Sequence, residues 1–404
     1  MQDTKRLFRT LAIANFLLYL GFNVWRAVFN NFAVEELGVS AAQVGFVQSA
    51  REIPGLLGFV LGFLVLWFSE MRIMGISVLL MGVGLVISGG AYNLGVLVAG
   101  TMVMSVGFHF FYPSNASLVL MGVGKEDAPE WLGRLRSISS LAAVAGTLII
   151  WILVEGVQIG PLSVPALGYR NLFYVMGGLV MVGSVFALRN GRQEQGGLLR
   201  KRRKMVFRRD YGIYYLLTFL MGSRRHIFST FAIFMLVQVH GIDVRQTALL
   251  FLVNNVISSY SAAQLGRLVT RFGERRMLTF NFIGLIGVFL GYAYVSYLPV
   301  LFALFVLDHI FFGFNLAVDS YFQKIAHGPE EITSNVSMAQ TINHISALVV
   351  PILGGILWER VAPSATFLAG VVIAVLSLVL VQFIRPSQVP AQVPLTAHEP
   401  PVGS

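Results

Sequence analysis

Two stretches of the chain share one pattern, and their spacing decides the architecture. Residues 25–34 read WRAVFNNFAV and residues 224–233 read RRHIFSTFAI, so both fit R-x-[VI]-F-x-x-F-A-[VI]. The offset from Arg26 to Arg225 is 199 residues (225 − 26), close to half of the 404-residue chain. The repeat therefore predicts two similar halves.

Two further matches follow in the same order. Residues 109–115 (HFFYPSN) and 309–315 (HIFFGFN) fit H-x-F-[YF]-x-x-N at an offset of 200 (309 − 109). Residues 138–155 and 342–359 align at an offset of 204 (342 − 138), and each segment ends in glutamate. Three matches in one order indicate a duplicated unit. Parallel repeats related by an axis along the membrane normal are typical of transporters.

The composition predicts an integral membrane protein. Hydrophobic residues make up 56% of the chain and charged residues only 12%, whereas a soluble domain carries about 25% charged residues. Cysteine is absent, which excludes disulfides and thiolate chemistry. The GxxxxGK[ST], HExxH and GxSxG motifs are also absent, so we expect neither an enzyme nor a cofactor. The basic residues lie mostly in short connectors, so we expect no nucleic-acid partner.

Long apolar runs fill most of the chain. A membrane helix needs about 20 apolar residues, whereas strands of a membrane barrel are about 10 residues long and alternate in polarity. The fold class is therefore an all-α membrane protein with twelve transmembrane helices in two pseudo-symmetric six-helix bundles. The twelve runs cover residues 8–34, 42–68, 72–93, 95–123, 134–157, 168–189, 211–238, 245–269, 276–297, 299–326, 335–358 and 364–385.

The 29 lysines and arginines set the expected orientation. Their densest run lies between the sixth and seventh helices. If both termini are inside, most basic residues of the connectors fall on the inner side, and only Arg170, Arg245 and Arg360 fall outside. The positive-inside rule then places both termini in the cytoplasm. We expect a multi-pass protein of the plasma membrane, which in a bacterium is the inner membrane.

The same features divide the chain into four segments. Residues 1–188 are expected to form the N-terminal six-helix bundle, 189–210 a basic cytoplasmic linker, and 211–385 the C-terminal six-helix bundle. Residues 386–404 are rich in proline, which predicts a disordered tail.

Charge within the helices indicates which of them surround a cavity. The runs at 72–93, 168–189, 276–297 and 364–385 contain no ionisable residue in their interiors. A charged group inside the membrane costs about 2.5–3.5 kcal/mol even on a lenient scale. These four helices are therefore expected to face lipid, and the other eight to line an aqueous cavity.

This arrangement resembles the major facilitator superfamily over residues 8–385. The family pattern G-x-L-a-D-r-x-G-r-[RK]-x-x-[LI] is matched between the eighth and ninth helices by Gly266, Leu268, Arg271, Gly273, Arg275 and Leu278. Thr270 replaces the acid of the pattern, and the equivalent loop after the second helix keeps only Gly62 and Leu64. The resemblance implies alternating access by rocking of the two bundles. It also implies a gating role for Gly266, Arg271, Gly273 and Arg275.

Two arginines occupy equivalent positions in the first and seventh helices. Arg26 shares a helix face with Asn23 and Asn30, at spacings of three and four residues, and Arg225 is its repeat mate. A guanidinium is planar and permanently charged, which suits bidentate binding of carboxylate or phosphate. We expect Arg26, Asn30 and Arg225 to bind an anionic substrate, and paired arginines at such positions occur in organic-phosphate transporters of the family. The alternative is that each arginine pairs with a nearby acid or carbonyl and stabilises the bundle.

His109 and His309 form a second symmetric pair. Tyr112 and Asn115 follow the first histidine, and Asn315 follows the second. Because histidine titrates near neutral pH, these residues are expected to hydrogen-bond the substrate or to relay protons. The alternative is that they are packing residues.

Asp308 and Glu52 are the acids that lie deepest in the expected helices. A buried carboxylate can load and release a proton within the physiological range, so we expect proton coupling at Asp308 or Glu52. The alternative is that Glu52 and Arg51 form structural salt bridges. Two histidines together with Asp308 would also suit a divalent metal, but the arginines oppose a cation and no metal site is expected.

The sequence therefore predicts a monomeric secondary transporter that moves a small, anionic organic solute, with protons as the coupling ion. A broad-specificity, proton-coupled exporter of amphipathic drugs or lipids is the first alternative, because the chain contains 32 Phe and 14 Met. A divalent metal transporter is the second alternative, and a non-transporting membrane receptor or scaffold is the third.

Overall fold

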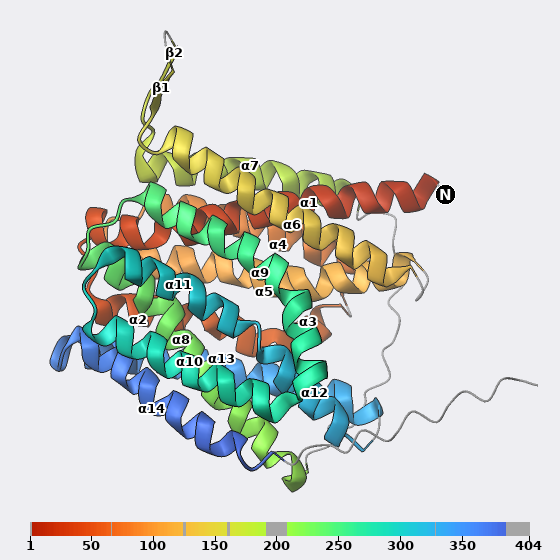
Figure 1. The fold of residues 1–404 in the computed structure, drawn as a ribbon. Helices are drawn as coiled ribbons and strands as arrows, with labels where there is room; N and C mark the ends of the chain where they lie inside the picture. Colours follow the sequence, from red (N-terminus) through yellow and green to blue (C-terminus); the bar gives the residue numbers. More distant parts are fainter. Residues whose placement is uncertain are drawn as a thin grey trace, which may run out of the picture.

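A computed structural model describes the chain in six stretches. Most of the linker expected at 189–210, and the whole tail expected at 386–404, lie outside them. Within the described residues the long helices run side by side (Figure 1). The described residues are 2–65, 67–123, 127–159, 162–190, 208–327 and 329–384.

The N-terminal half consists of seven α-helices and a hairpin. Its helices are α1 (Gln2–Asn31), α2 (Ala41–Leu56), α3 (Leu61–Leu64), α4 (Glu70–Gly89), α5 (Leu94–Gly122), α6 (Ala128–Leu153) and α7 (Gly168–Asn190). α1 continues into a π-helical turn, η1 (Phe32–Glu36), and α2 reaches α3 through a 3-10 turn, η2 (Leu57–Val60). Strands β1 (Val157–Ile159) and β2 (Leu162–Val164) pair antiparallel between α6 and α7. The expectation of helices alone is wrong here, because β-branched Val157 and Val164 form a cross-strand pair.

The C-terminal half repeats this order without a hairpin among its described residues. After a 3-10 turn, η3 (Arg209–Tyr211), it contains α8 (Gly212–Gln238), α9 (Val244–Phe272), α10 (Glu274–Tyr294), α11 (Leu298–Phe312), α12 (Asn315–Ile325), α13 (Pro329–Arg360) and α14 (Pro363–Val381). The repeat extends to helix caps. Ser40 and Gln43 form a capping box at α2, and Asp243 and Gln246 form one at α9.

Two expected membrane runs are divided into separate helices. Pro54 lacks a backbone N–H and lies inside α2, which ends two residues later and gives way to η2. The run at 299–326 divides at Gly313 and Phe314, between α11 and α12. Hydropathy averaged over a run does not report such breaks.

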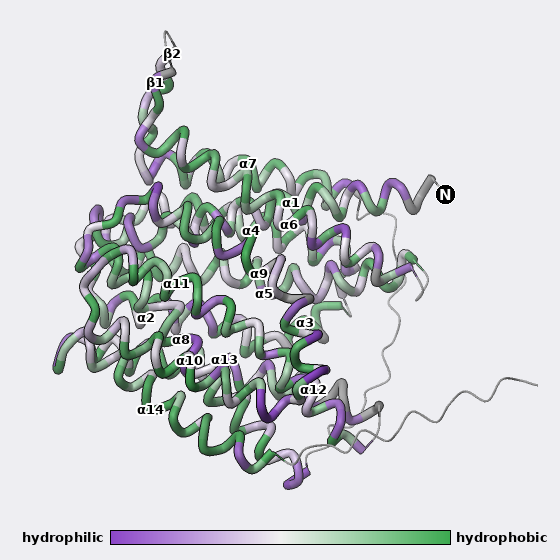
Figure 2. The backbone as a smooth tube through the Cα atoms, viewed as in Figure 1, coloured by the Kyte–Doolittle hydropathy of each residue, from purple (hydrophilic) through white to green (hydrophobic). Residues whose placement is uncertain are grey.

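Nine helical stretches of the described chain are long and apolar enough to cross a membrane. The expected runs at 42–68, 211–238 and 245–269 are not among them. α2 is interrupted, and α8 and α9 carry arginines and polar side chains along their length. In Figure 2 hydrophobic residues follow most of α14 and α11, whereas hydrophilic residues gather at α12 and near the start of α1. The chain is a multi-pass membrane protein.

Two helix pairs form the most extensive packing between the halves, and α1 also contacts α8 and α9 while α2 contacts α8. α2 packs against α13, and α6 packs against α9. The first pair is in backbone contact, because a side chain at Gly45 would overlap the carbonyl group of Pro351, and one at Gly355 would overlap Ala41 and Ala42. Small residues at such a crossing permit close approach of membrane helices.

Hydrogen bonds and ion pairs between the halves gather at the end of the bundle that carries β1 and β2. Asn31 donates to the Ile242 carbonyl at 2.9 Å and accepts from Thr247 at 3.1 Å. Arg245 pairs with Glu155 at 3.0 Å. We call this end the hairpin end, and the end at which α1 begins the N-terminal end; Figure 1 shows them on opposite sides.

A buried carboxylate anchors the start of the C-terminal half at the N-terminal end. Glu331 precedes the membrane-spanning part of α13 and accepts three hydrogen bonds from Arg208, the shortest at 2.7 Å. It also accepts one from the Tyr211 hydroxyl. These hydrogen bonds, with Arg208 as the largest contribution, lower the pKa of Glu331 below its ordinary value.

Candidate functional site

A polar cavity of about 420 Å³ lies between α8, α12 and α13. Its polar lining includes Arg225, Asn315, Asp319, Gln340, Asn343 and His344. Asn315 reaches the cavity because it is the first residue of α12, directly after the break in the tenth expected run. The cavity extends to Tyr214 and Val336, near the starts of α8 and α13.

The two arginines of the repeat each lie over a phenylalanine ring. The guanidinium carbon of Arg225 is 4.4 Å from the centroid of Phe312, which belongs to the same half. That of Arg26 is 4.3 Å from the centroid of Phe251, which belongs to α9 in the other half. Aromatic faces stabilise a guanidinium without neutralising it, so both charges remain available to a ligand. No local pattern distinguishes these two phenylalanines from the other phenylalanines among the 32 in the chain.

Two other arginines of the interior are neutralised by carboxylates. Arg224 is fully buried and donates to Asp308 at 2.8 Å. Arg51 donates to its neighbour Glu52, also at 2.8 Å. Pairing with an acid was part of the alternative interpretation of Arg26 and Arg225. The structure shows such ion pairs at Arg224 and Arg51 instead.

The interior carries an excess of positive charge. We call six side chains, each linked to others of the set by an ion pair or an electrostatic interaction, the central charge cluster: Arg26, Arg51, Glu52, Arg224, Arg225 and Asp308. Two of its four guanidinium groups are paired with its two carboxylates. Within the described part of the chain neither Arg26 nor Arg225 has an acid at salt-bridge distance, so two positive charges are uncompensated.

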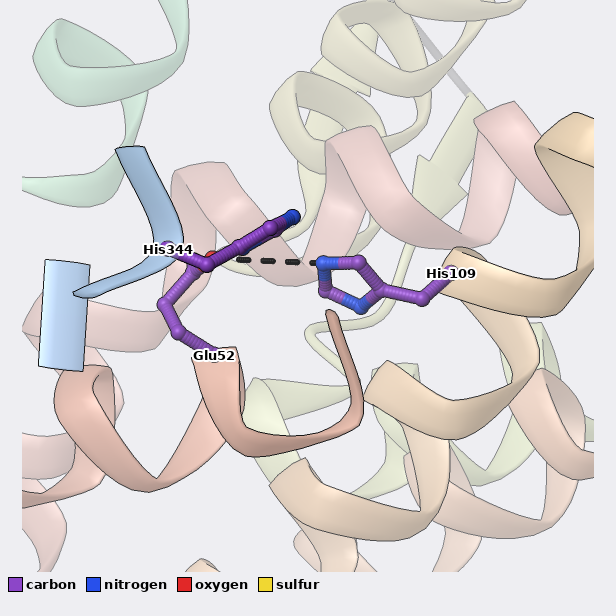
Figure 3. A group of neighbouring side chains, drawn as sticks. All are labelled: Glu52, His109 and His344. Atoms are coloured by element: carbon purple, nitrogen blue, oxygen red, sulfur yellow. Dashed lines mark hydrogen bonds and ion pairs between the residues drawn. The ribbon is translucent and has the colours of Figure 1, made fainter. Parts of the chain in front are cut away.

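The two histidines of the repeat do not meet. His109 lies 3.9 Å from Glu52, measured from Nε2 to Oε2, and its ring packs near His344 of α13. His344 is 3.1 Å from the same carboxylate oxygen, so α2, α5 and α13 contribute one residue each (Figure 3). His309 instead packs on the ring of Phe305, with 4.9 Å between centroids. The metal-binding set of two histidines and Asp308 is not assembled, because Asp308 is held by Arg224.

The remaining substrate-binding candidates differ in exposure. Asn30 and Asn115 are buried, and the side-chain oxygen of each lacks a hydrogen-bond partner within the described residues. Tyr112 is 62% exposed. Sequence reasoning missed His226, which is buried beside Arg225 and has no partner at Nε2 among the residues that the structure describes. His226 lies four residues after Gly222, and residues at this spacing share a helix face. Because Gly222 lines the polar cavity, this spacing is the feature of the sequence that could have pointed to His226.

The predicted gating loop joins α9 to α10 and makes its polar contacts within the C-terminal half. Gly273 has a φ of +82°, which favours glycine, and it ends α9. Arg275 donates to Gln382, at 3.2 Å for the shorter bond, while Arg271 lies over the Phe272 ring. The carbonyl oxygen of Gly266 accepts from Thr270.

A neighbouring acid makes the ion pair that Thr270 cannot make. Glu274 binds Lys324 at 2.6 Å and Ser320 at 2.7 Å. The carboxylate of Glu274 therefore links the loop to α12. It lies four positions after Thr270, where the family pattern has an acid.

A second, apolar cavity of about 540 Å³ lies between α9 and α11. Its lining is aliphatic and aromatic, and includes Leu250, Ile257, Phe302, Val306 and Ile310. Leu250 lines this cavity, whereas its neighbour Phe251, the ring under Arg26, is not part of the lining.

Comparison with known proteins identifies the fold. The family model described as Major Facilitator Superfamily matches residues 11–347. The solved structure of the nucleoside transporter NupG is 15% identical, covers 93% of this chain and 97% of that chain, and superimposes with a TM-score of 0.73. A bacterial homolog of the human lysosomal transporter Spinster, in an inward-facing and occupied conformation, is 14% identical, covers 93% and 95%, and gives a TM-score of 0.74. No curated protein matches the chain. At these sequence identities the structural similarity shows the fold and nothing more.

Proposed function

Since the chain belongs to the major facilitator superfamily, and is thus a transporter rather than an enzyme, we propose that it moves a small organic anion by alternating access. The observation that carries this proposal is the pair of uncompensated guanidinium groups, Arg26 and Arg225. An unpaired charge inside the membrane costs about 2.5–3.5 kcal/mol. A ligand of opposite charge removes that cost, so a carboxylate or phosphate is the solute that this interior favours.

Proton coupling follows from the same charge balance. Protonation of a carboxylate in the central charge cluster would raise the excess positive charge of the cluster and so strengthen anion binding. Thermodynamic linkage is reciprocal, so a bound anion would equally favour the protonated form. We assign this role first to Asp308, which is buried against Arg224 and acts electrostatically on Arg225. Glu52 remains the second candidate.

The proposed topology has twelve spans and both termini in the cytoplasm, in the plasma membrane, with a monomer as the transporting unit. In this orientation the hairpin end is external. The contacts of Asn31 and Arg245 then close the external side, and the polar cavity extends toward the cytoplasmic ends of α8 and α13. This geometry corresponds to an inward-facing state.

A thermal-shift screen of the purified full-length protein tests the anion clamp. Small carboxylates and phosphate esters should raise the melting temperature by mass action, whereas uncharged nucleosides should not. Arg26→Ala or Arg225→Ala each removes hydrogen bonds to a charged group, worth about 1.5–3 kcal/mol, so affinity should fall about ten- to a hundredfold. Arg26→Lys should restore only part of it, because lysine lacks the planar fork.

The exposed arginine Arg136 on α6 supplies the matched control. Arg136→Ala removes one positive charge outside the central charge cluster and should leave affinity unchanged. Anion binding that survives in both Arg26→Ala and Arg225→Ala would reject the clamp. If Asp308→Asn leaves the pH dependence of transport unaltered, the coupling assignment is wrong.

One observation favours a second function, export of amphipathic compounds. The apolar cavity between α9 and α11 could take a hydrocarbon chain. Val306→Trp should then block binding of an uncharged amphiphile, while Arg26→Ala should not. The reverse pattern would leave the small-anion transporter as the function.

A further inference from the structure

The cluster of Glu52, His109 and His344 joins both halves of the molecule (Figure 3). Its three ligand atoms, one from each residue, all lie within 4.8 Å of one another. From this geometry we infer a binding site for Zn²⁺, which would link α2 and α5 to α13 and hold the protein in the state with its hairpin end closed. Its three ligands differ from the two arginines of the anion clamp, although His344 and Arg225 line the same polar cavity, and the inference does not rest on the clamp.

The hydrogen bonds of His109 prepare one ring nitrogen for a metal. Its Nδ1 lies 2.9 Å from the carbonyl oxygen of Ser105. A carbonyl oxygen can only accept, so Nδ1 carries the proton and Nε2 keeps its lone pair. Nε2 is the nitrogen that faces Glu52. Zinc-bound histidines characteristically donate their other N–H to a backbone carbonyl or carboxylate, which fixes the ring.

The two oxygens of Glu52 have different partners. Oε1 accepts from Arg51 at 2.8 Å. Oε2 lies 3.1 Å from Nδ1 of His344 and 3.9 Å from Nε2 of His109. The carboxylate is therefore oriented by one oxygen, while the other points between the two imidazoles. A zinc ion would replace the proton that His344 and Glu52 share.

Gly55, one turn after Glu52 on α2, leaves the required space. A Cβ built at this position would lie 2.6 Å from Nδ1 of His344 and 2.8 Å from Nε2 of His109. Both donor nitrogens thus converge over a residue that has no side chain. A zinc ion takes nitrogen ligands at about 2.0–2.1 Å, so movements on the order of 1 Å would bring all three donors to bonding distance.

The donor set and its surroundings select the kind of metal. Two imidazoles and one carboxylate suit Zn²⁺, whereas Ca²⁺ needs six to eight oxygen ligands and Mg²⁺ prefers oxygens and water. Arg51 and Arg225 oppose any cation, so binding must come from the short bonds of the donor atoms rather than from net charge. This favours a modest, inhibitory site over a permanent structural one.

Zinc titration of the purified full-length protein, followed by thermal shift and by equilibrium dialysis with metal quantification, tests the inference. We expect one Zn²⁺ per chain and a higher melting temperature, and no effect of Mg²⁺. His109→Ala and His344→Gln should each weaken zinc binding at least tenfold. His240→Ala, which changes a histidine near the hairpin end, is the matched control and should bind zinc like the parent.

A glycine pair keeps the test decisive if the histidine variants fold poorly. Gly55→Ala would fill the space between the nitrogens while leaving all three donors in place, and should also weaken zinc binding at least tenfold. Gly58→Ala is its control, because a Cβ there meets nothing within 4 Å. In proteoliposomes zinc should slow transport by the parent and not by Gly55→Ala. Equal zinc affinity in the parent, His344→Gln and Gly55→Ala would overturn the inference, as would a parent protein that binds no zinc.

Discussion

The contact between α2 and α13 at the hairpin end predicts that one methyl group will change which side of the protein is open. In Gly45→Ala the new Cβ would lie 2.9 Å from the carbonyl carbon of Pro351, and still closer to its oxygen. Ordinary carbon contacts are about 3.5–4.0 Å, so the helices must separate by roughly 1 Å. Overpacking of this kind costs about 1–3 kcal/mol. In the alternating access proposed above this contact is made only when the hairpin end is closed, so the ratio of open to closed hairpin ends should rise about 5- to 150-fold.

The absence of cysteine makes this change directly measurable. Ser49 is buried one turn further along α2, and Ser49→Cys introduces a single thiol in a chain that has none. We expect a membrane-impermeant maleimide added on the hairpin side to label this thiol slowly in the parent and faster in Gly45→Ala. The control is Gly287→Ala on α10, because a Cβ there meets nothing within 4 Å. If labelling is equally slow in all three proteins, Gly45 does not control closure of this end.

Three further changes test the surrounding contacts. Asp308→Asn should lower the free energy of unfolding by about 3–5 kcal/mol, because Arg224 would be buried without its partner; thermal unfolding should show a smaller loss when both residues are replaced by leucine. Arg245→Ala removes a half-exposed pair with Glu155 and should cost less than about 1 kcal/mol, seen as a small rise in the same maleimide labelling. Glu331 has a lowered pKa in the folded protein, so it contributes stability above its unfolded pKa that is lost as the pH falls through the folded pKa. The melting temperature of Glu331→Gln should therefore fall less on acidification than that of the parent, and parallel curves would contradict this.

The fold was largely predictable because its signals are local. Long apolar runs and the repeat pattern are properties of consecutive residues, and they predicted a duplicated helical membrane protein. The breaks after Pro54 and at Gly313 were missed because a run of hydrophobic residues has the same mean hydropathy whether or not its helix is interrupted. The hairpin at 157–164 was missed because three-residue strands are too short to show alternation.

The site was predictable only in part, because its partners come from different helices. Charge inside an apolar run singled out Arg26 and Arg225, and the structure describes both as unpaired with acids. Their phenylalanine partners depend on how α9 and α11 are packed, which no local pattern reports. The meeting of His109 with His344 likewise depends on α2 packing against both α5 and α13.

Equivalent residues of the two halves show which contacts are set within one half and which depend on how the halves associate. His109 and His309 each hold Nδ1 to the carbonyl oxygen four residues earlier, at 2.9 Å in both cases. That bond is set by the helix, so duplication preserves it. Their other contacts differ, because His109 faces a carboxylate and a histidine across the interface while His309 packs on Phe305 of its own helix. Arg26 likewise crosses to the other half, and Arg225 does not. The contacts of His109 and Arg26 cross between the halves, so under the proposed alternating access they must change when the halves rock. Substitution at these two positions should therefore alter transport more than stability.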